Sequence, residues 1–239
     1  MITLTKMKPI TLSDCDVRAV LEGKKKAHVV PVNPQPPEGA NFLSLSDDMS
    51  IIRTDRRGME RDQHAEGLYA TFEHEGWPEF PVFRAPYQPG DVLYVRESWY
   101  LWYGNEYLYG ADDQDVNVGK LRRRASEDPL NKWRSPVTMP KDAARLFFKV
   151  MDVKVMRLRD LSVQEAVDCG IELSGQYAKE SREAGITRPF LPKIAFMKRW
   201  NDGYGKRRGL DVQSDPWVWL IRCATGNKCA MKGTGNDEG

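Results

Sequence analysis

The chain contains 239 residues, with 36 lysines and arginines against 34 aspartates and glutamates, so its formal charge is only +2 at neutral pH. A protein that holds nucleic acid mainly by neutralising phosphates carries a much larger positive surplus. That class is excluded, and any nucleic-acid binding must come from local patches and shape. Hydrophobic residues make up 41% of the sequence and charged residues 29%, which is typical of a folded globular protein.

Neither a membrane segment nor a disulfide framework is indicated. No stretch reaches the roughly 18 consecutive apolar residues of a membrane helix, and residues 1–6 lack the apolar core of a signal peptide. We therefore expect a cytoplasmic protein, in the host cytoplasm if a phage encodes it. Cys15, Cys169, Cys223 and Cys229 are widely spaced without a C-x-x-C pair, which predicts free thiols and no zinc site. We expect no metal and no cofactor.

The first predicted elements are a short strand over residues 8–12 and a helix behind it. Ser13 is a typical helix N-cap, and Gly23 stands where a glycine usually ends a helix. The lysine triplet 24–26 follows directly. Four prolines between positions 31 and 37 then break the regular pattern.

Two stretches are predicted insertions. Residues 39–76 have mixed charge and weak periodicity, which indicates short elements. Residues 104–130 contain a charged loop that follows a hairpin predicted over residues 100–109. We predict one domain over residues 1–223 with these two insertions, and a flexible, glycine-rich tail over residues 224–239.

The second half of the domain combines strand-like and helical patterns. Residues 92–95, 146–155 and 217–221 are rich in β-formers. Ser162 and Glu165 fit a capping box at the start of a helix, and residues 194–200 carry apolar side chains at helical spacing. Because strands outnumber helices and lie far apart in the sequence, we predict an α+β fold on a curled sheet or small β-barrel.

Three motifs, in order along the chain, resemble the ASCH family of PUA-like domains. They are residues 20–26 (VLEGKKK), 89–99 (PGDVLYVRESW) and 158–171, which open with LRDL and close with DCGI. Residues 7–10, 133–140 and 215–219 further resemble a phage and prophage subfamily that is often labelled morphogenetic. The resemblance implies a small β-barrel with flanking helices and a cleft that, in relatives, takes RNA or a modified nucleoside.

The chain also shows a distant similarity to a bacterial acetylcytidine amidohydrolase in this family. That enzyme uses a lysine, a threonine and a glutamate. The resemblance places its lysine at Lys25, its threonine at His28 and its glutamate at Cys169. Of the three residue types, only the lysine is retained.

Lys25, His28 and Glu97 are the candidate catalytic residues if the protein is an enzyme. A lysine in a desolvated cleft can orient a carbonyl or act as a base, and imidazole titrates near neutrality. Glu97 follows a strand, and we expect it to point inward as the carboxylate beside Lys25. The alternatives are a solvated basic turn, a partly buried strand histidine and a structural ion pair. Cys169 is expected to be a structural thiol.

Candidate residues for binding a nucleic acid or nucleoside combine charge with aromatic rings. Trp99 is the expected stacking platform, although aromatic clusters are more often core. Trp133 and Arg134, close to the basic triplet 122–124, are candidates to track a phosphate backbone. The full candidate binding set is Lys25, Arg96, Glu97, Trp99, Trp133 and Arg134. The run 206–208 is a second basic patch, with a solvated face as its alternative.

The leading hypothesis is a phage-type ASCH protein that recognises nucleic acid or a modified nucleobase in a cleft. Its expected partners are RNA, single-stranded DNA or a modified nucleoside, with no membrane. One alternative is an amidohydrolase acting on an acylated nucleoside such as acetylcytidine. Another is an adaptor that binds a host or virion protein. No phosphate-loop, Rossmann, zincin or α/β-hydrolase motif is present.

Overall fold

The structure is a computed structural model that describes residues 7–54, 60–75, 81–101, 106–112, 133–171 and 191–226; for residues 48–54 and 60–65 only the backbone is described. In chain order the strands and helices are β1 (Lys8–Thr11), α1 (Asp14–Leu21), β2 (Ala27–Pro31), β3 (Asn41–Thr54), β4 (Glu60–Glu73), β5 (Val82–Arg84), β6 (Val92–Arg96), β7 (Trp99–Leu101), β8 (Tyr107–Tyr109), β9 (Phe147–Arg157), α3 (Val163–Asp168), α5 (Leu191–Tyr204) and β10 (Trp217–Gly226). Short 3-10 turns are η2 (Gly110–Asp112), η3 (Pro136–Thr138), η4 (Lys141–Ala143) and η5 (Leu158–Asp160). No described helix is long and apolar enough to span a membrane.

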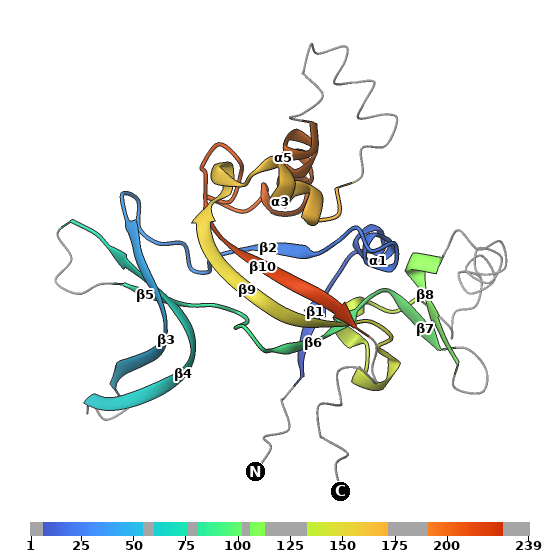
Figure 1. The fold of residues 1–239 in the computed structure, drawn as a ribbon, viewed down its shortest axis with the longest axis horizontal. Helices are drawn as coiled ribbons and strands as arrows, with labels where there is room; N and C mark the ends of the chain where they lie inside the picture. The colour runs from blue at the N-terminus through green and yellow to red at the C-terminus, as the bar shows by residue number, and fades with distance from the viewer. Residues whose placement is uncertain are drawn as a thin grey trace, which may run out of the picture.

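The centre of the fold is a five-stranded mixed sheet in the order β1-β6-β9-β10-β2. β1 and β6 are parallel, and the other neighbours are antiparallel. The long strands β9 and β10 curve across the molecule (Figure 1). The expected α+β class is confirmed. Among the described strands, β1 and β2 do not pair with each other, so the sheet is open and no closed barrel is found.

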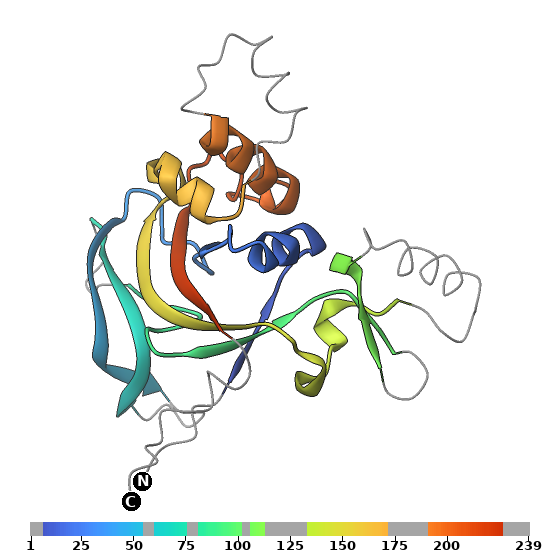
Figure 2. The same ribbon diagram turned by 45° about the vertical axis from the view of Figure 1, so that its right-hand side comes forward.

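β10 shows how the sheet separates two hydrophobic clusters. Trp217, Trp219 and Ile221 point into a cluster shared with α1 and the three-stranded sheet β3-β4-β5, whereas Val218 and Leu220 face α3 and α5. This alternation follows from the two-residue period of a strand with both faces covered. Figure 2 shows α3 and α5 stacked on one side of β9 and β10.

The region 39–76 differs from the expectation of short elements. β3 and β4 are each 14 residues long and pair antiparallel as one extended hairpin. Register shifts between Phe42 and Ser44 and between Ser46 and Asp48 interrupt the pairing. A bulge breaks the two-residue period, which explains why the sequence shows only weak alternation here. The hairpin is joined to the main core by Phe72, whose ring lies 4.9 Å from that of Trp217 in an edge-on contact.

The predicted helix starts are confirmed. Ser13 accepts a hydrogen bond from the Asp16 amide at the start of α1, and Gly23 has a φ of +69° just behind that helix. Ser162 and Glu165 form the predicted capping box at the start of α3. The predicted tail begins at residue 224, but residues 224–226 still belong to β10 and pair with β9. Of the predicted insertion over 104–130, only residues 106–112 are described, and the tail from 227 onward also lies outside the described residues.

Candidate functional site

A cavity of about 600 Å³ lies between α1, the edge strand β2, the end of α3 and α5. This volume is within the usual range of small-molecule sites. The lining comes from segments that are far apart in the sequence. It comprises Thr11, Ser13, Cys15 and Asp16 near α1, Lys25, His28 and Val29 at β2, Cys169 at the end of α3, and residues of α5 and the turn behind it, including Phe196, Arg199, Trp200, Asp202, Tyr204 and Arg207.

Lys25 is a buried part of the cavity wall. Its backbone forms a β-bridge with Cys169, and its side chain is only 4% exposed. The ammonium donates a hydrogen bond to the Cys169 carbonyl at 2.9 Å. Gly170 makes this approach possible, because a Cβ at that position would lie 3.0 Å from the Lys25 Cβ. Lys24 and Lys26 are exposed, so Lys25 is distinct from a solvated basic turn.

Asp16 is the carboxylate that partners Lys25. Its Oδ1 lies 2.9 Å from the Lys25 Nζ, and its Oδ2 forms an ion pair with the Arg199 guanidinium and accepts a hydrogen bond from the Ser13 hydroxyl. Burial opposes ionisation, but the two cations outweigh it and hold the pKa of Asp16 well below its usual range. One carboxylate therefore pairs with two cations in the cavity wall, and the cluster keeps one net positive charge.

His28 lines the same cavity from β2. Burial, followed by the positive charges of Lys25 and Arg199, lowers the pKa of His28 to about 3, against the opposing effect of Asp16. The imidazole is consequently neutral at physiological pH. One ring nitrogen is then a donor and the other an acceptor.

The two cysteines in the lining differ. Cys169 is 2% exposed, and burial raises the pKa of its thiol to about 11 despite the opposing effect of Lys25. It remains a thiol, as expected for a structural cysteine. Cys15 is exposed at the first turn of α1, and its Sγ lies 3.1 Å from the Ser13 Oγ.

Three aromatic residues of α5 line the same cavity and form its aromatic wall. Phe196, Trp200 and Tyr204 stand at four-residue intervals, which places them on one face of α5. The Trp200 and Tyr204 ring centroids are 4.5 Å apart. Trp200 is buried and donates a hydrogen bond to the Leu210 carbonyl, whereas Tyr204 is half-buried. The helical spacing of these aromatic residues is the sequence signal that could have identified this wall.

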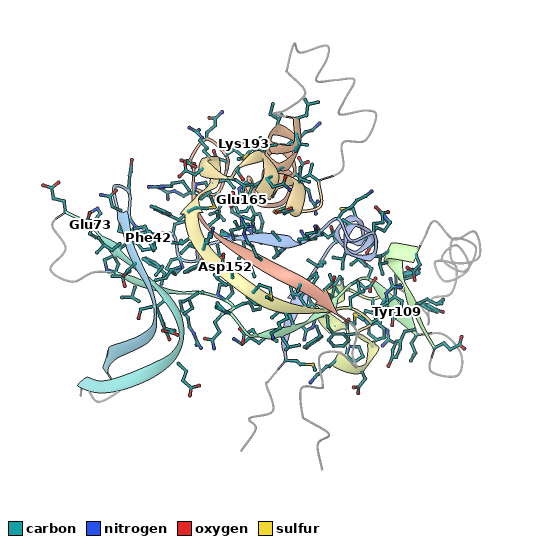
Figure 3. All side chains as sticks on the ribbon, in the orientation of Figure 1. Phe42, Glu73, Tyr109, Asp152, Glu165 and Lys193 are labelled. Atoms are coloured by element: carbon teal, nitrogen blue, oxygen red, sulfur yellow. The ribbon has the colours of Figure 1, made fainter. Side chains whose placement is uncertain are left out.

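Glu97 is not the partner of Lys25, which corrects the expectation from sequence. It is fully buried, and its two carboxylate oxygens accept hydrogen bonds from Arg145 at 2.9 Å each. Arg145 also binds Asp112, and its guanidinium lies 4.0 Å from the Tyr109 ring centroid. Burial raises the pKa of Glu97, although the Arg145 hydrogen bonds act against it. Figure 3 shows Tyr109 at one end of the molecule and Phe42 and Glu73 at the other.

Trp99 also differs from the stacking platform that was expected. It is 4% exposed and packs in a cluster with Met139 and Phe147. The Arg134 guanidinium lies 4.8 Å from its ring centroid, and the backbones of the two residues form an isolated β-bridge. A ring buried in this way offers no open face to a base. The physical reason is that burying this large apolar ring against Met139 and Phe147 is more favourable than leaving it exposed to solvent.

The remaining candidates lie near Trp99 rather than in the cavity lining. Arg96 donates a hydrogen bond to the Tyr94 hydroxyl at 2.8 Å, and Trp133 packs against the Tyr100 ring. The cavity thus brings together Lys25 and His28 but not Glu97 or the set around Trp99. The basic triplet 122–124 lies outside the described residues.

A comparison of the chain with protein-family models, with curated proteins and with solved structures finds no match. Among the residues that the structure describes, no group of three or more histidine, cysteine, aspartate or glutamate side chains is placed to hold a metal ion. What the cavity does offer is a carboxylate acceptor, guanidinium and ammonium donors, a neutral imidazole and three aromatic side chains.

Proposed function

We propose that this chain is an ASCH-type protein that binds a nucleobase, modified or not, in the cavity between α1, β2 and α5. The base belongs to a nucleoside or to a strand of nucleic acid. The observation that carries the proposal is the pairing, within one cavity, of an aromatic wall with a buried cluster of Asp16, Lys25 and Arg199.

The aromatic wall supports a planar, heteroaromatic ligand. Proteins bind unpaired bases mainly by stacking them on aromatic side chains, and Tyr204 is a half-buried ring in the lining. The Trp200 ring packs against the Tyr204 ring, with centroids 4.5 Å apart, and Trp200 is itself held by its hydrogen bond to the Leu210 carbonyl. A ring fixed in this way loses little entropy when a base packs against it.

The polar cluster supports recognition of a base edge. A base presents N–H donors beside carbonyl or ring-nitrogen acceptors. Asp16 supplies an acceptor, Arg199 supplies donors, and neutral His28 supplies one of each. Because Asp16 is held ionised by its two cations, its acceptor is in place before a ligand arrives.

The PUA-like barrel implied by the resemblance is part of this proposal. The curled five-stranded sheet with α3 and α5 on one face supports it, as does the position of Lys25 two residues before the edge strand β2. In this arrangement the cavity lies between the sheet edge at β2, α1 and α5.

Hydrolysis of an acylated nucleoside is the second candidate function. Lys25, His28 and Cys169, the three positions that match the catalytic set of the amidohydrolase, all line the cavity. However, a histidine with a pKa of about 3 is a weak general base at neutral pH. Release of acetate from N4-acetylcytidine above the buffer blank, lost in Lys25→Met, would favour this candidate.

Calorimetric titration with the common ribonucleosides and N4-acetylcytidine tests the binding proposal. We expect at least one of them to bind, and Tyr204→Ala to weaken that binding by about 5- to 150-fold, because a stacked base is worth about 1–3 kcal/mol. Tyr107→Ala is the matched control, since Tyr107 is a half-buried tyrosine on β8 outside the lining. Equal losses in the two variants, or no binding to the wild type, would contradict the proposal.

A further inference from the structure

A run of basic residues lies at the mouth of the cavity, and binding of a nucleobase alone does not require it. Lys206, Arg207 and Arg208 follow α5 after Gly205, and all three are exposed. Arg207 belongs to the cavity lining, and its guanidinium lies 5.5 Å from the ring centroid of Tyr204. A cationic side chain therefore stands next to the ring proposed to stack a base.

The charges of the lining leave this cation without a counterpart. Lys25 and Arg199 share Asp16, and both ion pairs lie in the wall. Within the described ranges, no carboxylate forms an ion pair with Arg207. Asp202 is the other carboxylate in the lining, so three cations stand against two anions. The lining therefore carries a net positive charge, and the exposed Lys206 and Arg208 on either side of Arg207 add to it at the mouth.

We infer that the cavity binds its base as a phosphate ester, with the phosphate on Arg207 at the mouth. This inference rests on the proposed function and specifies its ligand as a nucleotide. The planar guanidinium donates paired hydrogen bonds to phosphate oxygens, and the adjacent Lys206 and Arg208 add positive potential. The carboxylate of Asp202, which also belongs to the lining, repels a phosphate and limits the gain in affinity. The phosphate can belong to a free nucleotide or to a strand.

The test compares each common ribonucleoside with its 5′- and 3′-monophosphates by calorimetry. We expect one monophosphate to bind about tenfold more tightly than its nucleoside, with the gain decreasing as salt is added. Arg207→Gln should remove most of this gain, measured as the ratio of monophosphate affinity to nucleoside affinity within the same variant, so that any effect of the substitution on base binding cancels. Lys149→Gln removes the same charge from an exposed site on β9 outside the lining and should retain the gain.

The outcomes separate this inference from the proposed function. If nucleosides bind but neither monophosphate binds more tightly, or if Arg207→Gln and Lys149→Gln behave alike, the phosphate site is wrong and the base site stands. If neither nucleosides nor nucleotides bind, the proposed function fails and the phosphate site fails with it. A dinucleoside monophosphate that binds as tightly as the better mononucleotide would support a strand as the source of the phosphate, and weaker binding would support a free nucleotide.

Discussion

Asp16 is the residue on which the electrostatics of the cavity depend. It is buried and forms ion pairs with Lys25, which follows α1, and with Arg199 of α5. A motif at residues 20–26 is sufficient to select Lys25 from sequence. Its partner could not be predicted in the same way, because Asp16 stands three residues after Ser13 and fits the capping pattern of a helix start equally well. Arg199 comes close only when α5 packs, which no local pattern encodes.

His28 predicts a specific dependence of stability on pH. Its folded-state pKa of about 3 lies below the ordinary value of about 6.5, so the unfolded chain takes up the proton first as the pH falls. The contribution of His28 is fully present above about pH 6.5 and is lost as the pH falls toward 3. The free energy of unfolding should decrease by up to about 1.4 kcal/mol per pH unit.

Urea denaturation between about pH 7 and pH 5, before most carboxylates titrate, measures this slope. We expect His28→Gln to flatten it. His74→Gln, which changes a histidine outside the cavity lining, should leave it in place. Parallel pH profiles for the wild type and His28→Gln would show that the imidazole is not buried among cations as described.

Because Glu97 lies outside the cavity lining, its replacement should reduce stability without reducing ligand binding. Glu97→Ala removes both hydrogen bonds to Arg145 and leaves that guanidinium with Asp112 alone. The free energy of unfolding should fall by roughly 3 kcal/mol, the order expected for a broken buried pair. Nucleoside affinity in the folded variant should stay within about twofold of the wild type. If the variant is fully folded and still loses much of its nucleoside affinity, Glu97 contributes to the binding site and this account of its role is wrong.

At the scale of elements, α3 is a short helix that supports the cavity wall. Its C-terminal cap residue, Cys169, provides the carbonyl that accepts from Lys25. Its N-terminal end is fixed by the capping box, and Glu165 also binds Arg222 on β10 at 3.0 Å. Figure 3 shows Glu165 close to the sheet. A helix of six residues depends on such contacts, because its own hydrogen bonds are too few for independent stability.

Ser162→Ala therefore should lower the free energy of unfolding by about 1 kcal/mol, the usual cost of a lost N-cap. Glu165→Gln is the conservative comparison, because glutamine retains the capping geometry and loses only a part-exposed ion pair. It should cost less than about 0.5 kcal/mol. Chemical denaturation of the two variants measures the difference. Equal costs would mean that the charge of Glu165, rather than the cap, holds α3.

Local signals predicted some elements well and others poorly. Helix starts were correct where a capping residue marks them, as at Ser13 and Ser162, and the strand over 217–221 followed from its alternating apolar residues. The long hairpin β3–β4 was not predicted, because its bulges remove the alternation on which strand prediction depends. Glu97 points inward as predicted, but its partner is Arg145 rather than Lys25, and Trp99 is buried rather than open to a base; both outcomes depend on residues far away in the sequence.

At the scale of the whole molecule, the cavity exists only because α5 closes over two segments from the other end of the chain. α1 and β2 come from residues 14–31, and α5 comes from residues 191–204. The sheet brings them together. β2 pairs with β10, and α5 packs against β10 in one hydrophobic cluster. A ligand that contacts both segments would stabilise the folded chain by mass action.

Protection of Cys15 from alkylation tests the central claim most directly. Cys15 is exposed in the lining, whereas Cys169 and Cys223 are buried; Cys229, outside the described residues, is removed by Cys229→Ser. The rate of modification by iodoacetamide, located by peptide mapping, is measured against increasing concentrations of the nucleoside or nucleotide that binds most tightly. We predict that Cys15 alkylation slows in a saturable manner, with the same Kd as calorimetry. An unchanged rate at saturating ligand would place the binding site elsewhere and contradict the account.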